Sequence, residues 1–505
     1  MGQYLLGIDI GGTGIKAGLF HAGGEMLAMA RRDMEILTPA SGYAELSPLK
    51  IWEDIVSLID ECSREAGVGK NKISSIACSS TCPAVAALDK NGIPLRDVIM
   101  NFDCRSKAQV EEVLERAGPD KIFAATGNRL LAGAVSASSI MWIRDNEPDI
   151  YRKIFCFGHL TTYIMHRLTG RFVLDNTQAS FTGFFRTREM SGWDVELLDI
   201  YGIDSEKLPL LLQPWEPAGN ISGRAAADTG LKKNTAVAAG AADTVCSALG
   251  IGITGPGEVF ISSGTSEILS GVLEEPDFEK RFLNRTYIGG KWIYHAPTST
   301  SGAALNWLKR AFSPEDMEIG DFYDHISRLS AGSPAGSGGL FFLPYLQGER
   351  SPWWDSDARG VFAGITLGTS RADMFRSVLE SIGFALKQNL DIAEKHAGTD
   401  YREVLLTGGG SKNRIWSQIK SDITGRVLKI PGFKETAIRG AAMLGGICSG
   451  IYRDAEDAVK RNKKDVFTVI EPDMKKHRDY CRLAENFQSL YQALIPEFKK
   501  LGTAV

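Results

Sequence analysis

The sequence predicts an α/β protein made of two halves with a common design. Amphipathic helical stretches alternate along the chain with short apolar runs of strand length, which is the pattern of layered α/β domains. Residues 4–20 and 257–272 also repeat one arrangement, in which two β-prone runs flank a corner rich in Gly, Ser and Thr. The 505 residues leave room for roughly two to four domains. We place a boundary near residue 245, which gives domains 1–245 and 246–505.

The first half begins with a predicted hairpin. Residues 4–10 and 15–20 alternate like strands on either side of the turn Gly11-Gly12-Thr13-Gly14. Apolar residues then recur at helical spacing from residue 49 to 65, which predicts an amphipathic helix. The apolar run at 73–78 has the length of a buried strand.

The second half repeats this pattern. Its hairpin places the turn Ser263-Gly264-Thr265-Ser266 between two β-prone runs. Residues 331–339 are rich in Gly and Ser but end in an apolar run, so they predict a loop that leads into a strand, not a linker between domains. Further on, residues 404–406 predict a strand and residues 413–423 a helix.

Charge and composition exclude several classes of protein. The 57 basic and 61 acidic side chains give a net charge of −4, without the basic surplus that a phosphate backbone requires, so we expect no nucleic-acid partner. The eight cysteines are dispersed and not spaced as a disulfide framework, which indicates reduced thiols in a cytoplasmic protein. Because no run of eighteen apolar residues occurs, we expect no membrane span.

The turn of the first hairpin carries the groups of a nucleotide-phosphate clamp. Gly11 and Gly12 leave backbone N–H groups open to phosphate oxygens, and Thr13 adds a hydroxyl. Asp9, at the end of the preceding strand, is placed to hold Mg²⁺, often through water. Two other interpretations stay open. Residues 12–17 also fit a dinucleotide string, although that motif must open a helix, and the hairpin can be purely structural.

Two further glycine-rich turns offer similar groups. Gly264 and Thr265 lack an acid, and two such turns facing each other would hold one phosphate chain from both sides. Gly408, Gly409 and Gly410 lie between a strand and a helix, where a flat ring could lie against the chain and the helix N-terminus favours an anion. A flexible turn is the alternative for this third cluster.

Asp243 is the only charged residue in the apolar, small-residue stretch 236–252. A carboxylate in such surroundings is costly unless it is paired or functional. Beside a phosphate site, it could accept the proton of a hydroxyl during phosphoryl transfer. Alternatively, Asp243 is the N-cap of a helix that starts at Thr244, and the two roles can coexist.

Other chemistries lack their motifs in this sequence. It contains no P-loop GK[ST], no HExxH and no GxSxG nucleophile elbow. Cys78 and Cys82 form a single CxxxC without partners, so we expect no structural metal site.

In their order along the chain, these motifs resemble the FGGY family of carbohydrate kinases, which belongs to the superfamily of actin, hexokinase and heat-shock-protein ATPases. The resemblance covers essentially the whole chain. The matching segments are Asp9–Thr13 (first phosphate motif), Gly264–Thr265 (second), Gly408–Gly410 with Asn413 (adenosine motif), Gly240–Asp243 (catalytic aspartate) and residues 360–365 with 373–380 (carboxy-terminal signature).

The resemblance implies two actin-like, ribonuclease H-like domains that face each other across a cleft, with sugar mainly on the first and ATP mainly on the second. It implies ATP-dependent phosphorylation of a terminal hydroxyl of a small sugar, most simply a ketopentose of the xylulose or ribulose type. Asp243 would be the general base and would share Mg²⁺ with Asp9. By position, Gly302 and Asn306 would lie near the nucleotide. The expected partner is a small sugar or polyol, and a homodimer is left open.

The sequence departs from the family where the acceptor is expected. Many xylulose and gluconate kinases carry a Gln-Met-His type motif after the strand that here begins at residue 73, whereas this chain reads Cys-Ser-Ser-Thr81-Cys82-Pro. Thr81 and Cys82 are closer to ribulokinase-like members, and Asp103 and Arg105 match the family's Asp-x-Arg element. We therefore expect these four side chains to contact the acceptor. Without a histidine as hydrogen-bond partner, the site should differ in which acceptor hydroxyls it recognises.

Three alternatives are carried forward. Within the family, the acceptor could be another polyol or a sugar acid, such as L-xylulose, erythritol, glycerol or gluconate. A sugar kinase of the ROK type would share Asp-Ile-Gly-Gly-Thr, but its zinc-binding cysteine cluster is missing from this sequence. An actin-like protein that binds nucleotide without transferring phosphate would need no base, and Asp243 argues against it.

Overall fold

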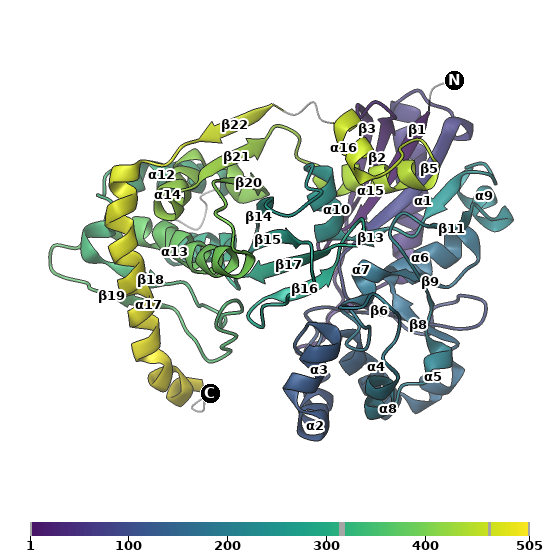
Figure 1. Cartoon of the computed structure of the whole chain (residues 1–505), viewed down its shortest axis with the longest axis horizontal. Helices are drawn as coiled ribbons and strands as arrows, with labels where there is room; N and C mark the ends of the chain where they lie inside the picture. The colour runs from purple at the N-terminus through teal and green to yellow at the C-terminus, as the bar shows by residue number, and fades with distance from the viewer. Residues whose placement is uncertain (1–2, 313–318, 463–465, 503–505) are drawn as a thin grey trace.

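The computed structural model describes residues 3–312, 319–462 and 466–502. Within these residues, two seven-stranded mixed sheets form the centres of two halves that lie side by side (Figure 1). The first half also contains a four-stranded antiparallel sheet of β4 (Glu45–Leu46), β7 (Val98–Met100), β6 (Ala84–Leu88) and β8 (Cys156–His159). None of the helices in the described residues is both long and apolar enough to cross a membrane.

The first large sheet has the order β11-β12-β5-β1-β2-β3, with β13 also paired to β5. Its central strand β1 is antiparallel to β2 and parallel to β5. The strands are β1 (Tyr4–Ile10), β2 (Gly14–His21), β3 (Met26–Asp33), β5 (Ile73–Ser80), β11 (Pro217–Asn220), β12 (Ala236–Ala238) and β13 (Ala241–Ala242).

The second large sheet repeats this plan, in the order β16-β17-β15-β14-β20-β21-β22. Its central strand β14 is antiparallel to β15 and parallel to β20, as β1 is to β2 and β5. The strands are β14 (Val259–Ser263), β15 (Glu267–Leu273), β16 (Leu283–Thr286), β17 (Trp292–Pro297), β20 (Glu403–Thr407), β21 (Val427–Pro431) and β22 (Phe467–Ile470). The predicted repetition of the hairpin is confirmed. The dinucleotide interpretation is wrong, because strand β2 and not a helix follows the first turn.

The predicted helices are also present. Residues 49–65 fall in α1 (Pro48–Glu65), and residues 413–423 correspond to α14 (Arg414–Thr424). The other helices of the first half are α2 (Lys107–Ala117), α3 (Pro119–Thr126), α4 (Ser136–Asn146), α5 (Pro148–Lys153), α6 (Leu160–Thr169), α7 (Asn176–Ala179), α8 (Val195–Tyr201), α9 (Gly223–Thr229) and α10 (Asp243–Gly250). The later helices are α11 (Gly302–Phe312), α12 (Ile319–Ala331), α13 (Arg371–Ala397), α15 (Thr436–Cys448), α16 (Ala455–Asn462) and α17 (Met474–Gly502).

Short elements complete the chain. The loop predicted at 331–339 leads into β18 (Phe341–Leu343), which pairs with β19 (Val361–Ala363). β9 (Val173–Asp175) pairs with β10 (Leu210–Leu212). The 3-10 turns are η1 (Lys70–Lys72), η2 (Ser205–Lys207), η3 (Ser337–Gly339) and η4 (Gly409–Lys412).

Helix α15 returns from the second half of the chain to the first sheet. Figure 1 shows it beside β1, β2 and β5, next to α10. A Cβ on Gly7 of β1 would stand 2.1 Å from the Ile438 carbonyl oxygen, and one on Gly440 would stand 1.9 Å from the Cys246 carbonyl oxygen. Only glycine permits such close backbone contact. The late segment therefore helps to hold α10, and with it Asp243, against the first sheet.

The two faces of β1 are buried in different layers. Leu6, Ile8 and Ile10 pack in the cluster that includes α1, while Leu5 packs toward Ile438 of α15. This alternation follows from the period of two along a strand. Burying each such side chain stabilises the fold by about 1.5–3 kcal/mol, so β1, which leads into the turn at residues 11–14, is held by packing on both faces.

Candidate functional site

Strand register brings two of the predicted acids to one edge of the first sheet. Asp9 on β1 lies beside Ser79 on β5, and Ala241 on β13 lies on the other side of Ser79. Asp243 follows two residues after Ala241 as the first residue of α10. The Ser79 hydroxyl donates a 2.7 Å hydrogen bond to Asp9 Oδ1.

Both acids are held in an environment that disfavours their charge. Burial raises the pKa of Asp9 to about 7, with a further rise from the nearby Asp243 charge, against the Ser79 hydrogen bond that lowers it. Burial also raises the pKa of Asp243, while the positive charge of Arg285 lowers it. Oδ1 of Asp243 accepts a 2.7 Å hydrogen bond from its neighbour's backbone, Thr244 N.

The N-cap interpretation of Asp243 is wrong. The helix begins at Asp243 itself, its N-cap is Ala242, and no side chain caps this end. An N-cap side chain usually accepts a hydrogen bond from the second or third backbone N–H of the helix. The Asp243 carboxylate does not have this capping role.

The turn Gly11-Gly12-Thr13-Gly14, which the sequence predicts as the first phosphate turn, has free backbone donors. Gly11 N donates to Gly14 O at 3.0 Å, and Thr13 O accepts from Met34 N at 3.1 Å, which fixes the turn. Gly12 and Thr13 are exposed, and among the described residues their N–H groups have no acceptor. Donors presented in this way suit phosphate oxygens.

The second turn is supported by the N-terminus of α11. Gly264 N donates to Ser266 O at 2.8 Å, while Gly302 N and Ala303 N donate to the carbonyls of Gly264 and Thr265, each at 3.0 Å. A Cβ on Gly302 would lie 2.7 Å from Gly264 O. Three predicted residues, Gly264, Thr265 and Gly302, thus meet, and Asn306 is exposed one turn further along α11.

The third glycine cluster lies against the strand that carries the second turn. A Cβ on Gly408, which has φ +86°, would meet Ser263 O at 2.4 Å, and a Cβ on Gly410 would meet Ser263 Oγ at 2.3 Å. Gly409 faces open space. Asn413 is the N-cap of α14: its Oδ1 accepts from Trp416 N at 3.0 Å. The structure therefore brings the predicted adenosine loop next to Gly264, and gives Asn413 a capping role.

A buried ion pair that the sequence analysis missed lies under these two turns. Ser263 Oγ donates to Glu267 Oε2 at 2.7 Å and accepts from Lys420 Nζ at 2.9 Å, and Lys420 also pairs directly with Glu267. Both charged side chains are 1% exposed. The network fixes Ser263 between the second turn and the glycine cluster.

Thr81 and Cys82 follow β5 close to Asp9. Thr81 N donates to Ile10 O at 2.8 Å, which ties this segment to the end of β1. Cys82 Sγ lies 3.8 Å from His159 Nδ1, and burial raises the pKa of the thiol to about 12. Cys82 is therefore a neutral thiol and not a nucleophile.

Asp103 and Arg105 are bound to each other inside the first half. Arg105 donates from its Nη2 to Asp103 Oδ2 at 2.8 Å and pairs with Glu45 at 2.7 Å. Its guanidinium lies over the rings of Tyr43 and Trp142, at 3.9 and 4.9 Å. Their hydrogen-bonding groups are thus taken up by protein partners, and their predicted contact with the acceptor stays a prediction.

With this geometry described, comparison with known proteins gives the family. Residues 4–250 match the N-terminal domain of the FGGY family of carbohydrate kinases, and residues 259–449 match the C-terminal domain of that family. The chain belongs to the FGGY family. The resemblance stated from the sequence is confirmed, as is the enzyme class: this FGGY protein is a carbohydrate kinase, with ATP and a small sugar as substrates.

Relatives align over the whole length of this FGGY kinase. The xylulose kinase of Bacillus subtilis (strain 168) is 28% identical and covers 100% of this chain and 99% of its own. The L-xylulose/3-keto-L-gulonate kinase of Escherichia coli (strain K12) is 29% identical, with 98% of each chain covered. The solved xylulose kinase of Rhodospirillum rubrum, at 28% identity, superposes with a TM-score of 0.90 over 98% of this chain and 100% of the other. The predicted two-domain, actin-like α/β fold is confirmed.

Asp175 of this FGGY kinase was not predicted as a site residue, although an Asp three residues before Gln178 is a helix-start signal. Thr177 Oγ1 donates to Asp175 Oδ1 and accepts from Ala242 N at 2.9 Å, which joins α7 to the residue before Asp243. Burial raises the pKa of Asp175 to about 7. Several buried polar atoms of this region have no partner among the described residues, namely Asp175 Oδ2, Asn176 Oδ1, Gln178 Nε2, Thr244 Oγ1 and Thr286 Oγ1.

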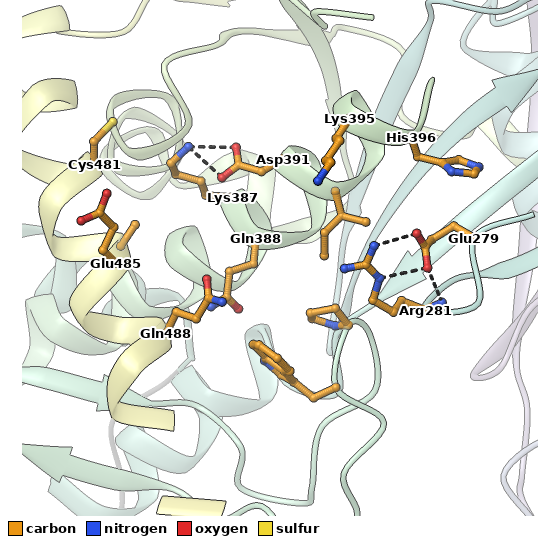
Figure 2. Close-up of a pocket in the computed structure, with 14 residues that line it drawn as sticks. Glu279, Arg281, Lys387, Gln388, Asp391, Lys395, His396, Cys481, Glu485 and Gln488 are labelled. Carbon is orange, nitrogen blue, oxygen red and sulfur yellow. Dashed lines mark hydrogen bonds and ion pairs between the residues drawn. The ribbon is translucent and has the colours of Figure 1, made fainter. Parts of the chain in front are cut away.

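A cavity of about 860 Å³ lies elsewhere in this FGGY kinase, between α13, α17 and the loop before β16 (Figure 2). Its rim carries the ion pairs Arg281–Glu279 and Lys387–Asp391. Residues predicted to bind nucleotide, metal or sugar do not line it. Its volume alone therefore does not make it the catalytic site.

Proposed function

We propose that this FGGY kinase transfers the γ-phosphoryl group of ATP to a terminal hydroxyl of a small sugar, with Asp243 as general base. The observation that supports this role is the sheet register, in which Asp9 and Ala241, two residues before Asp243, both pair with Ser79. In this proposal, Asp243 accepts the proton of the attacking hydroxyl as its oxygen forms the bond to phosphorus and ADP leaves.

The phosphate chain of ATP would be held by backbone donors. Gly11, Gly12 and Thr13 would contact it from the first half, and Gly264 and Thr265 from the second. Gly302 and Asn306 would lie beside the nucleotide, with the loop Gly408, Gly409 and Gly410 under the adenosine and Asn413 shaping that loop as a helix cap. Binding of the phosphate chain by backbone N–H groups needs no basic surface, in agreement with the net charge of −4.

Mg²⁺ fits the donor set of Asp9 and Asp243. The described residues contain no cluster of three or more His, Cys, Asp or Glu that could hold a metal. Mg²⁺ usually takes only one or two carboxylates and completes its shell with water and substrate phosphates. Asp9 would hold it through water, with Asp243 nearby, and bound Mg²⁺ would neutralise charge on the phosphates.

The acceptor would lie between Asp243 and α7. The unpartnered buried atoms of Asp175, Asn176, Gln178 and Thr286 are the donors and acceptors that a polyhydroxy ligand needs. Thr81 and Cys82 would border this region, and contact of Asp103 and Arg105 with the acceptor stays a prediction. A ketopentose of the xylulose or ribulose type is the first candidate. Kinases of a sugar acid or another polyol are the alternative.

We also propose a cytoplasmic location for this kinase. All eight cysteines are free, which suits a reducing, cytoplasmic location. A homodimer and the boundary near residue 245 stay predictions. Nucleic acid and membranes are not expected partners.

A coupled assay of ADP release tests the function. Purified protein with Mg²⁺ and ATP is offered D- and L-xylulose, D- and L-ribulose, erythritol, glycerol and gluconate in turn. We expect ADP release only with a cognate acceptor. An actin-like binding protein would bind ATP and release no ADP with any of them, and that result would reject the kinase proposal.

The variant Asp243→Asn tests the general base. It should keep ATP binding and lose roughly 10²–10⁴-fold in kcat, the usual contribution of a general base. Asp228→Asn is a matched control, because Asp228 forms an ion pair with Arg167 within the first half. Turnover of Asp243→Asn close to that of the control would exclude Asp243 as the base.

A further inference from the structure

Arg285 is a buried cation without an anionic partner. It lies on β16, is 4% exposed, and its Nε and Nη1 atoms are buried without a hydrogen-bond partner. Among the described residues, no carboxylate lies within ion-pair distance of it, and no oxygen accepts a hydrogen bond from its guanidinium. A guanidinium cannot lose its proton in a protein, so its burial is costly unless an anion compensates its charge.

Arg285 is held in place from both sides. The preceding residue, Asn284, exchanges hydrogen bonds of 2.8 and 2.7 Å with Asn128, and the following backbone N–H donates to Ser180 Oγ at 3.1 Å. The guanidinium lies 4.2 Å from the centre of the Phe181 ring. These contacts join the edge of the second sheet to the first half, so Arg285 reaches the site from across the interface between the halves.

The guanidinium lies beside the end of α7, because it packs on Phe181 and the next residue is hydrogen-bonded to Ser180. Its charge lowers the pKa of Asp243 and of Asp175, against the rise that burial causes in each. It also lowers the pKa of Cys82. Because Ser180 and Phe181 directly follow α7, these contacts put Arg285 next to the region proposed for the acceptor.

We propose that Arg285 binds the carboxylate of the acceptor, and that this kinase therefore phosphorylates a sugar acid. The inference rests on the proposed kinase function and, among the acceptors proposed there, favours a sugar acid over a ketopentose. The hydroxyls of a neutral sugar would accept hydrogen bonds from Arg285 but form no ion pair with it, whereas a carboxylate would supply both the hydrogen bonds and the ion pair. Asp243 is not a substitute partner, because it must stay free to take the hydroxyl proton.

The transfer step itself is unchanged by this assignment. The terminal oxygen of the sugar acid bonds to the γ-phosphorus, the bond to the leaving ADP oxygen breaks, and the hydroxyl proton goes to Asp243. Arg285 would hold the carboxylate at the other end of the same molecule. It is thus a specificity residue, distinct from the general base.

The test compares acceptors that differ only in this group. D-gluconate is paired with its neutral counterpart D-glucitol, further aldonates with the corresponding alditols, and 2-keto-aldonates with the corresponding ketoses. We expect wild-type kcat/KM to favour the acid of each accepted pair. Arg285→Gln should lower kcat/KM for the acid roughly a hundredfold, mainly through KM, and leave neutral acceptors almost unchanged. kcat/KM of Arg285→Lys for the acid should lie between the values of wild type and of Arg285→Gln.

Arg188→Gln is the matched control. Arg188 also packs its guanidinium on an aromatic ring, 4.6 Å from the centre of Phe278, and its Nε donates to the Ala124 carbonyl. Loss of this arginine should not change the preference for acids. If Arg285 variants fail to fold, calorimetric titration of wild-type protein with gluconate and, separately, with D-glucitol measures the same preference, and equal affinities would contradict the proposal.

Three results would overturn the proposal or its basis. Turnover of neutral sugars with no aldonate accepted would reject Arg285 as a carboxylate site and leave the kinase function intact. If Arg285→Gln instead shifted the acidic limb of the pH profile equally for every acceptor, Arg285 would serve only to keep Asp243 charged. No ADP release with any acceptor would count against the proposed function itself.

Discussion

Ser79 donates its hydroxyl hydrogen bond to Asp9 from the neighbouring parallel strand, at 2.7 Å. The bond opposes the burial that raises the pKa of Asp9 to about 7. Ser79 also stands between Asp9 and Ala241 in the sheet, so it lies at the centre of the edge that carries both acids. It is a positioning residue that the motif Asp-Ile-Gly-Gly-Thr does not contain.

We predict that Ser79→Ala weakens the use of Mg-ATP. Removing a hydrogen bond to a charged carboxylate costs about 1.5–3 kcal/mol, which is roughly a tenfold or larger loss in affinity. The Mg²⁺ concentration for half-maximal activity should rise, most strongly at low pH where Asp9 is protonated. Ser80→Ala is the control, because Ser80 Oγ donates only to the Thr81 carbonyl. Equal Mg²⁺ dependence of the two variants would contradict the role of Ser79.

The rate should depend on pH through Asp243. A general base acts only when deprotonated, and burial raises the pKa of Asp243 above the ordinary aspartate value of about 3.9. Activity should therefore be present at neutral pH and be lost as pH falls through the raised pKa. kcat/KM for the acceptor, measured with saturating Mg-ATP from about pH 4.5 to 9, checks this. A profile flat down to the lowest of these pH values would contradict the raised pKa.

The local parts of the fold could be predicted from the sequence, and the long-range parts could not. The hairpin around Gly11 and its repeat around Gly264 depend on neighbouring residues, and both are present. The return of α15 to β1 depends on contacts such as that of Gly7 with Ile438, which are far apart in the chain. The sequence alone does not show that the glycine at position 7 allows the backbone of α15 to approach β1 closely.

In the candidate site too, features formed by neighbouring residues could be predicted, and features formed by distant residues could not. Glycine-rich turns and the isolated Asp243 are visible because unusual residues cluster in a short stretch. Arg285 and Lys420 were missed because a single Arg or Lys in a sequence reads as surface, and only the fold shows that each is buried. Asp103 shows the opposite case, since its motif was visible but its oxygens are engaged by protein donors.

Gly302→Ala should weaken ATP binding. Alanine favours a helix over glycine by about 1 kcal/mol, but a Cβ at this position would stand 2.7 Å from the Gly264 carbonyl oxygen. The second phosphate turn must shift, so we expect KM for ATP to rise about tenfold or more while the acceptor KM changes little. Gly320→Ala is the control, because a Cβ on Gly320 of α12 meets no atom within 4 Å. Wild-type KM for ATP in Gly302→Ala would refute the steric argument.

Removing only one member of the Lys420–Glu267 ion pair should destabilise the fold, whereas removing both members together should not. Lys420→Met leaves Glu267 charged and buried, a change that typically costs about 3–5 kcal/mol, whereas replacing both with apolar residues is often neutral. We expect urea unfolding of Lys420→Met at much lower concentration than wild type, and recovery in Lys420→Met/Glu267→Leu. The double variant should still bind ATP less well, because Ser263, which packs against the loop proposed to bind adenosine, loses both polar partners. If the single variant were as stable as wild type, the pair would not be the buried ion pair that the structure shows.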